Sequence, residues 1–137
     1  MLALGLGSQS PITIGACIAV MLATPAMPQT TVARESVPVV IKAEPDKDAC
    51  ATGTVEGLSV DGFLSVRSGP GTSFAEEGRL SNKDLVHWCA EDGDWVGIVY
   101  PLGANCGVST SWQETGPYQG PCKSGWAHRR WLRPLAG

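Results

Sequence analysis

The first 33 residues of this 137-residue chain contain no Lys, Arg, Asp or Glu, so every charged side chain of these types lies in the remainder. That remainder has no basic excess, because ten Lys and Arg stand against thirteen Asp and Glu. Nucleic acids and anionic membranes attract proteins through a basic face, so no general affinity for either is expected. The chain also has no C-x-x-C pair, and its two histidines lack metal-ligand spacing. We therefore expect no metal and no cofactor.

Motifs that indicate catalysis are missing too. The chain has no G-x-S-x-G sequence, and His87 and His128, its only histidine bases, lie in no recognised catalytic motif. The glycine-rich loop at residues 67–72 is followed by neither G-K-[ST] nor a helical pattern, so it does not resemble a phosphate-binding loop. We expect no enzymatic activity.

Helical patterns are lacking as well, because no segment has a convincing apolar stripe at helical spacing. Seventeen Gly, ten Pro and five Trp are typical of turns and short strands. The predicted fold class is all-β, with about five strands drawn from residues 52–55, 64–67, 77–80, 85–90, 95–100 and 125–128. Within residues 85–90, Val86 and Trp88 fall on one face, and His87 and Cys89 fall on the other.

Residues 12–23 form an uncharged and mostly apolar run, which has the length of a signal-peptide core and is short for a membrane span. Small residues offer a cleavage site after Ala26 and a second after Ala33, and we prefer the first. The sequence thus predicts a signal peptide over residues 1–26 and a periplasmic or secreted protein. Two alternatives stay open: an uncleaved membrane anchor, and lipidation at Cys17, because residues 14–17 resemble a lipobox.

Four cysteines remain once Cys17 is assigned to the leader, and an even number suits disulfides in an oxidising compartment. Three connectivities exist, and the sequence alone does not decide among them. We favour Cys106 with Cys122, which closes a local loop, and Cys50 with Cys89, which ties the first strand to a central one.

Residues 27–48 mix Pro, Thr and alternating charges without a sustained apolar period, so they are predicted to form a flexible linker. An edge strand at residues 39–41 is the alternative. The folded domain is expected over residues 49–134. Its Ser68-Gly69-Pro70-Gly71 turn should use positive φ at the two glycines around the rigid proline, while Arg67 holds the loop by hydrogen bonds.

Several short motifs, taken in order, resemble the bacterial SH3-like domain family. They are L-S-V-R-S-G-P-G-T-S-F at residues 64–74, G-R-L at 78–80, D-W-V at 94–96, G-W-A at 125–127 and W-L at 131–132. The matches cover about residues 51–133. The resemblance implies a small, strongly bent β-barrel in the cell envelope. Such domains usually serve as binding or targeting modules for peptidoglycan or a protein partner and carry no chemistry of their own.

One long insertion departs from this family pattern. Where the family commonly has a short hairpin before its G-W motif, this chain has 24 residues, 101–124, with a cysteine near each end. The insertion is rich in Gly, Ser, Thr and Pro and is not expected to bury much around Trp112 and Tyr118, so binding and packing are equally open for these two side chains. We therefore expect an SH3-like barrel with a long, disulfide-closed insertion before its last strand.

Aromatic side chains are the main candidates for ligand contact, because Trp and Tyr offer large contact area at small entropic cost. The candidates are Trp112, Tyr118, Phe74, Trp95 and Tyr100. The hypothesis is a monomeric, non-catalytic module that binds a cell-wall polymer or an envelope protein. The alternative is a secreted inhibitor or regulator of an envelope enzyme that acts through the insertion. A basic C-terminal end either stays solvated or meets an anionic polymer or acidic partner; it comprises Lys123, His128, Arg129, Arg130 and Arg133.

Overall fold

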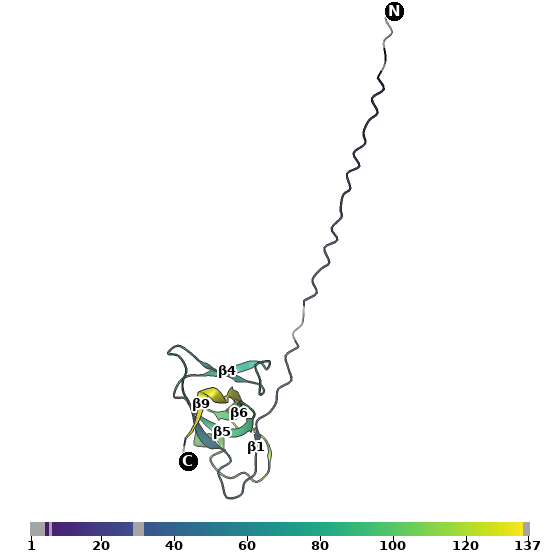
Figure 1. The fold of residues 1–137 in the computed structure, drawn as a ribbon. Coiled ribbons are helices and arrows are strands. Elements are labelled where there is room, and N and C mark those ends of the chain that lie inside the picture. Colours follow the sequence, from purple (N-terminus) through teal and green to yellow (C-terminus); the bar gives the residue numbers. More distant parts are fainter. Residues whose placement is uncertain (1–4, 6, 29–31, 136–137) are drawn as a thin grey trace, which may run out of the picture. The chain divides into compact units, whose positions relative to one another are not determined.

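The computed structural model describes residues 5, 7–28 and 32–135 (Figure 1). The chain divides between Thr30 and Thr31 into two units. In the first unit, residues 7–28 form neither helix nor strand. No helix in the described part of the chain is long and apolar enough to cross a bilayer. Residues 1–4 and 6 of the predicted signal peptide and residues 29–31 of the predicted linker lie outside the described residues.

The second unit is built from β-strands, which confirms the predicted all-β class. Its main sheet has seven antiparallel strands in the order β4-β3-β8-β6-β5-β2-β9. These strands are β2 (Ala51–Val55), β3 (Leu64–Arg67), β4 (Glu76–Leu80), β5 (Leu85–Asp92), β6 (Trp95–Tyr100), β8 (Lys123–His128) and β9 (Leu132–Leu135). A separate pair joins β1 (Val40–Ile41) to β7 (Gly116–Pro117), and two short 3-10 turns are η1 (Ala104–Cys106) and η2 (Arg129–Trp131).

Most strands lie close to where alternation and turn residues predict them. Residues 64–67 and 95–100 are strands β3 and β6 with the predicted bounds. Strand β5 runs two residues further than expected, to Asp92, and then turns at Gly93, whose φ is +56°. The last strand, β9, was not predicted, and it pairs with β2 along its full length. β4 and β9, the two edges of this sheet, do not pair with each other in the described residues.

The main sheet separates two hydrophobic cores, and β6 contributes to both because its side chains alternate between faces. Val96 and Ile98 enter the first core, and Val99 enters the second. The predicted faces of β5 are confirmed: Val86 and Trp88 belong with the first core, and Cys89 with the second. The first core comprises Val55, Leu64, Val66, Leu80, Val86, Val96, Ile98, Tyr100, Ala127 and Leu132, and the second comprises Val39, Ile41, Cys50, Val99, Cys106, Val108, Tyr118 and Trp126.

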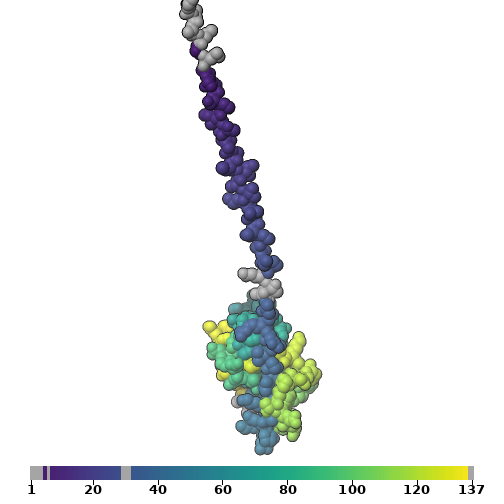
Figure 2. All heavy atoms as spheres, turned by 90° about the vertical axis from the view of Figure 1, so that its right-hand side faces the viewer, coloured from purple at the N-terminus to yellow at the C-terminus, as the bar shows by residue number. Residues whose placement is uncertain are grey.

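Residues 37–42, which we call the strap, pack against the domain although they belong to the predicted flexible linker. Val39 and Ile41 are almost completely buried, whereas Val40 between them is 39% exposed. This alternation marks a strand with one buried face. Figure 2 shows the strap, in blue, beside the yellow-green insertion, which supplies its partner strand β7. The linker prediction is therefore wrong for this segment, and the edge-strand alternative describes it.

Backbone hydrogen bonds hold the strap along its length. The Val37 N–H donates to the Ser68 carbonyl, and the Val37 carbonyl accepts from the Trp126 indole N–H, both at 2.8 Å. Further along, the Val39 carbonyl accepts from the Tyr118 N–H at 2.8 Å. Gly97 leaves room for the strap, because a Cβ there would lie 3.0 Å from Val39 Cγ1. The strap is thus a structural part of the second core.

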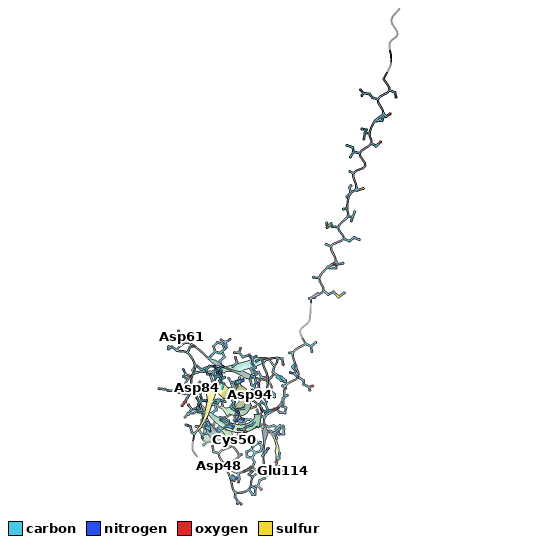
Figure 3. The ribbon with its side chains drawn as sticks, in the orientation of Figure 1. Asp48, Cys50, Asp61, Asp84, Asp94 and Glu114 are labelled. Carbon is cyan, nitrogen blue, oxygen red and sulfur yellow. A yellow bond between two sulfur atoms is a disulfide. The ribbon has the colours of Figure 1, made fainter. Side chains whose placement is uncertain are left out.

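Two disulfides connect the cysteines in the pairing that we favoured. Cys50 bonds to Cys89 over 39 residues, and Cys106 bonds to Cys122 over 16 residues. Figure 3 labels Cys50, which lies just before β2. Disulfides of this kind form and persist in oxidising compartments. Both bonds therefore indicate an oxidising, extracytoplasmic environment for the protein.

The Ser68-Gly69-Pro70-Gly71 turn is shaped by packing and not by positive φ. Neither Gly69 nor Gly71 is among the described glycines with positive φ, so the predicted backbone reason is wrong. Instead, a Cβ at Gly69 would overlap the ring of Phe74, which is buried beneath the turn. A Cβ added at Gly71 would lie 3.3 Å from Phe74 Cδ2, which is a much milder contact.

Gly69→Ala should therefore lower the free energy of unfolding by about 1–3 kcal/mol, the usual cost of overpacking a well-packed site. Gly71→Ala serves as the matched control and should cost less than about 1 kcal/mol. Denaturant unfolding of the two variants measures the difference. Equal stability of both variants would contradict the proposed role of the Phe74 ring.

Candidate functional site

The structure divides the five aromatic candidates into buried and partly exposed side chains. Phe74, Tyr100 and Tyr118 are buried, whereas Trp95 and Trp112 are half-buried. Direct contact with a large ligand requires exposed surface, so the three buried rings act through packing in this structure. Trp95 and Trp112 remain the candidates with accessible faces.

Tyr118 stabilises the insertion from inside. Its hydroxyl donates to the Cys106 carbonyl at 2.8 Å and accepts from the Cys122 N–H at 3.2 Å. It thereby bridges the two ends of the loop that the Cys106–Cys122 disulfide closes. The strap and the loop cover its ring, so the expectation that the insertion buries little around Tyr118 is wrong.

Trp112 lies over Tyr118 at the surface of the insertion. The two rings are stacked, with centroids 6.4 Å apart and planes 28° from parallel. The Trp112 indole N–H donates to the Gly107 carbonyl at 3.0 Å, which orients the indole. One face of Trp112 is therefore used for packing, and the half-buried ring keeps some exposed surface.

Tyr100 belongs to the first core and is not a surface contact. Burial raises the pKa of its phenol, and the negative charge of Glu77 raises it further. The hydroxyl lies close to Gly78 of β4, where a Cβ would meet it at 2.5 Å. Tyr100 therefore stays protonated at neutral pH and serves as a neutral packing residue.

Trp95 lines a groove of about 250 Å³ that we call the aromatic groove. Three aromatic side chains from different parts of the chain meet there: Phe63 before β3, Trp95 at the start of β6, and Trp131 in η2. Polar groups complete its walls, notably Arg67, Thr72 and His128. Aromatic walls beside polar groups are a feature of ligand-binding sites.

Strand register places two of these side chains together. Trp95 of β6 pairs with His128 of β8, and their rings meet edge to face with centroids 5.3 Å apart. His128 Nδ1 accepts a hydrogen bond from the Arg130 N–H at 3.1 Å. The neutral ring therefore carries its proton on Nε2 and offers a hydrogen-bond donor at that nitrogen.

Arg67 connects the aromatic groove to the Ser68-Gly69-Pro70-Gly71 turn. Its Nη1 donates to the Phe74 carbonyl at 3.0 Å, so it holds the loop as the sequence suggests. Arg67 also lines the groove, which adds a positive charge beside the aromatic walls. No carboxylate in the described residues forms an ion pair with this guanidinium.

Phe63 is the most exposed of the three aromatic walls of the groove. Its side chain is 46% exposed, and the guanidinium of Arg79 lies 3.8 Å from the ring centroid. Sequence reasoning missed Phe63 and Trp131 as ligand contacts, and it considered His128 only as part of the basic C-terminal end. Trp131 lies within the matched W-L motif, so that motif was a usable signal, whereas Phe63 precedes the first matched residue.

The insertion takes no part in the aromatic groove, because no residue of 101–124 lines it. Figure 3 places Asp61, in the loop that leads to Phe63, at the opposite end of the domain from Glu114 of the insertion. The sequence candidates therefore do not form a single site: Trp95 belongs to the aromatic groove and Trp112 to the insertion.

The described residues contain no group of three or more His, Cys, Asp or Glu side chains placed to hold a metal ion. Comparison of the chain with models of known protein families, with curated proteins and with solved structures found no match.

Proposed function

We propose that this chain is an exported, non-catalytic binding module that recognises a cell-wall polymer or an envelope protein through the aromatic groove. The observation that carries the proposal is the convergence of Phe63, Trp95 and Trp131 on one groove beside Arg67 and His128. Aromatic faces with nearby donors suit sugar rings and extended peptides alike. The disulfides and the predicted signal peptide support a location in the envelope or outside the cell.

An SH3-like barrel is the proposed form of the fold. Two features support it. First, the pairing register shifts in β3 between Val66 and Arg67 and in β5 between Trp88 and Ala90, and such irregularities bend strands. Second, η2 leads directly into β9, which pairs with β2 and so brings the end of the domain beside its first main strand.

Phe63→Ala tests the proposed site with little risk to the fold, because Phe63 is half exposed and lies outside both cores. Retention of the full chain on purified peptidoglycan, or on an identified envelope protein, should weaken by about tenfold or more, as expected for an aromatic anchor. Val60→Ala is the matched control, because Val60 lies in the same loop, is 98% exposed and does not line the groove. Equal retention of both variants would contradict the site.

An inhibitory role of the insertion is the second candidate function. Its disulfide, the two hydrogen bonds of the Tyr118 hydroxyl and its pairing with the strap hold the loop in one shape. A preorganised loop loses less entropy on binding, which is how rigid loops block enzyme clefts. Capture of one envelope enzyme that Trp112→Ala weakens and Phe63→Ala does not would favour this function over wall binding.

A further inference from the structure

A second groove, of about 500 Å³, lies on a different part of the domain, and we call it the arginine groove. Its exposed apolar surface comes from Trp88 and Pro134, whereas Leu132, which also lines it, is buried in the first core. Its charged walls are Arg129, Arg133 and Glu91. It shares no residue with the aromatic groove. A ligand that enters it would therefore contact a separate surface.

Arg129 is held in place by its neighbours. Its Nη2 forms an ion pair with Glu91 Oε2 at 3.3 Å, and the other oxygen of Glu91 accepts from the Trp88 indole N–H at 3.0 Å. The guanidinium carbon lies 5.8 Å from the Trp88 ring centroid. Each carboxylate oxygen of Glu91 thus has one partner within the protein, and its charge is balanced by Arg129.

Arg133 provides a positive charge that no carboxylate of the described residues balances. Its Nη1 donates to the carbonyls of Arg130 and Leu132, at 3.2 and 3.1 Å, which orients the guanidinium. The charged walls of the groove therefore sum to one net positive charge, from two arginines and one glutamate. This local excess lies in a chain whose formal net charge is −3.

We propose that the arginine groove binds the C-terminal residue of a peptide partner whose last side chain is apolar. The guanidinium of Arg133 matches a carboxylate, since its planar fork pairs with two oxygens. The exposed surface of Trp88 and Pro134 matches an apolar side chain. In an ordinary peptide, only the C-terminal residue joins a carboxylate and an apolar side chain in one residue. The inference goes beyond the proposed function and does not depend on it.

N-acetyl-L-leucine is the probe, and the reporter is the NMR signal of the Trp88 indole N–H, assigned through Trp88→Phe. Titration of the full chain should shift this signal saturably. N-acetyl-L-leucinamide, which lacks the carboxylate, should bind at least about tenfold more weakly. Acetate, which lacks the apolar group, should give no saturable shift. Added salt should weaken the binding.

Arg133→Gln should weaken binding of N-acetyl-L-leucine by about fivefold or more, because it removes the unbalanced charge. Arg133→Lys, which keeps the charge but not the fork, should have an intermediate effect and provides a milder change if the Gln variant does not fold. Arg130→Gln is the matched control, because it removes the same charge three residues away without lining the groove. It should change the affinity by less than about twofold.

Three results would overturn the inference: equal affinity for the amide, equal loss in Arg130→Gln and Arg133→Gln, or a shift at the Trp131 indole in place of Trp88. The last result would assign the probe to the aromatic groove. Phe63→Ala should leave probe binding unchanged, so failure at one groove is distinguishable from failure at the other.

Discussion

Ile41→Ala should lower the free energy of unfolding by about 2–5 kcal/mol, the range for truncating a buried Ile or Leu. Ile41 is completely buried in the second core, between the sheet and the insertion. Truncating the Ile41 side chain would leave a cavity. The two disulfides limit how far the surrounding residues can move to fill it. Val40→Ala, one residue away on the 39% exposed face, should cost less than about 1 kcal/mol.

Denaturant unfolding of the full chain measures both variants, with equal m-values as the sign that only stability has changed. A flexible linker predicts no effect for either substitution, so the pair separates a structural strap from a tether. Equal, small effects would show that residues 37–42 do not contribute to the core in solution.

The strap is a part of the fold that the local sequence does not predict. Residues 39–41, V-V-I, are too short a run to display alternation, and the Pro and charged residues on both sides are typical of a linker. What makes them a strand is the partner β7, which lies more than 70 residues further along the chain. Such non-local pairing is not visible in a local pattern.

The same non-local contact explains why Tyr118 was misjudged. The insertion is indeed rich in small and polar residues, and alone it would not bury a large ring. Val39 and Ile41 supply the missing apolar cover from outside the insertion. The cysteine pairing that we favoured, by contrast, is confirmed, although the sequence alone left three connectivities open.

The candidate site was predicted only in part. Trp95 was identified as a ligand contact, whereas Arg67 was expected only to hold the turn, and its place in the groove was not predicted. Phe63 was not identified, because a single Phe at the end of a loop gives no periodic signal. Whether a ring faces a groove or a core depends on strand register and on neighbours from distant elements, as Tyr100 and Trp95 on the same strand illustrate.

Removing each disulfide should destabilise the domain by a different amount, because the two bonds close loops of different length. The Cys50–Cys89 bond spans 39 residues, and the chain-entropy relation gives a loss of about 4 kcal/mol for the variant with both cysteines changed to Ala. The Cys106–Cys122 bond spans 16 residues, and the same relation gives about 3 kcal/mol. Cys17→Ala is the control and should change nothing, because Cys17 is free and exposed.

The two variants should also differ in where the structure loosens. Cys50 and Cys89 join β5 to the residue before β2, so losing their bond should reduce hydrogen-exchange protection across the main sheet. Cys106 and Cys122 are bridged a second time by the Tyr118 hydroxyl, so losing their bond should leave the loop partly held and lower protection chiefly in residues 101–124 and the strap. The expectation is contradicted if both variants lose hydrogen-exchange protection equally across the main sheet. In that case the strap and the insertion open only together with β5 and β2, and the two cores unfold as one unit.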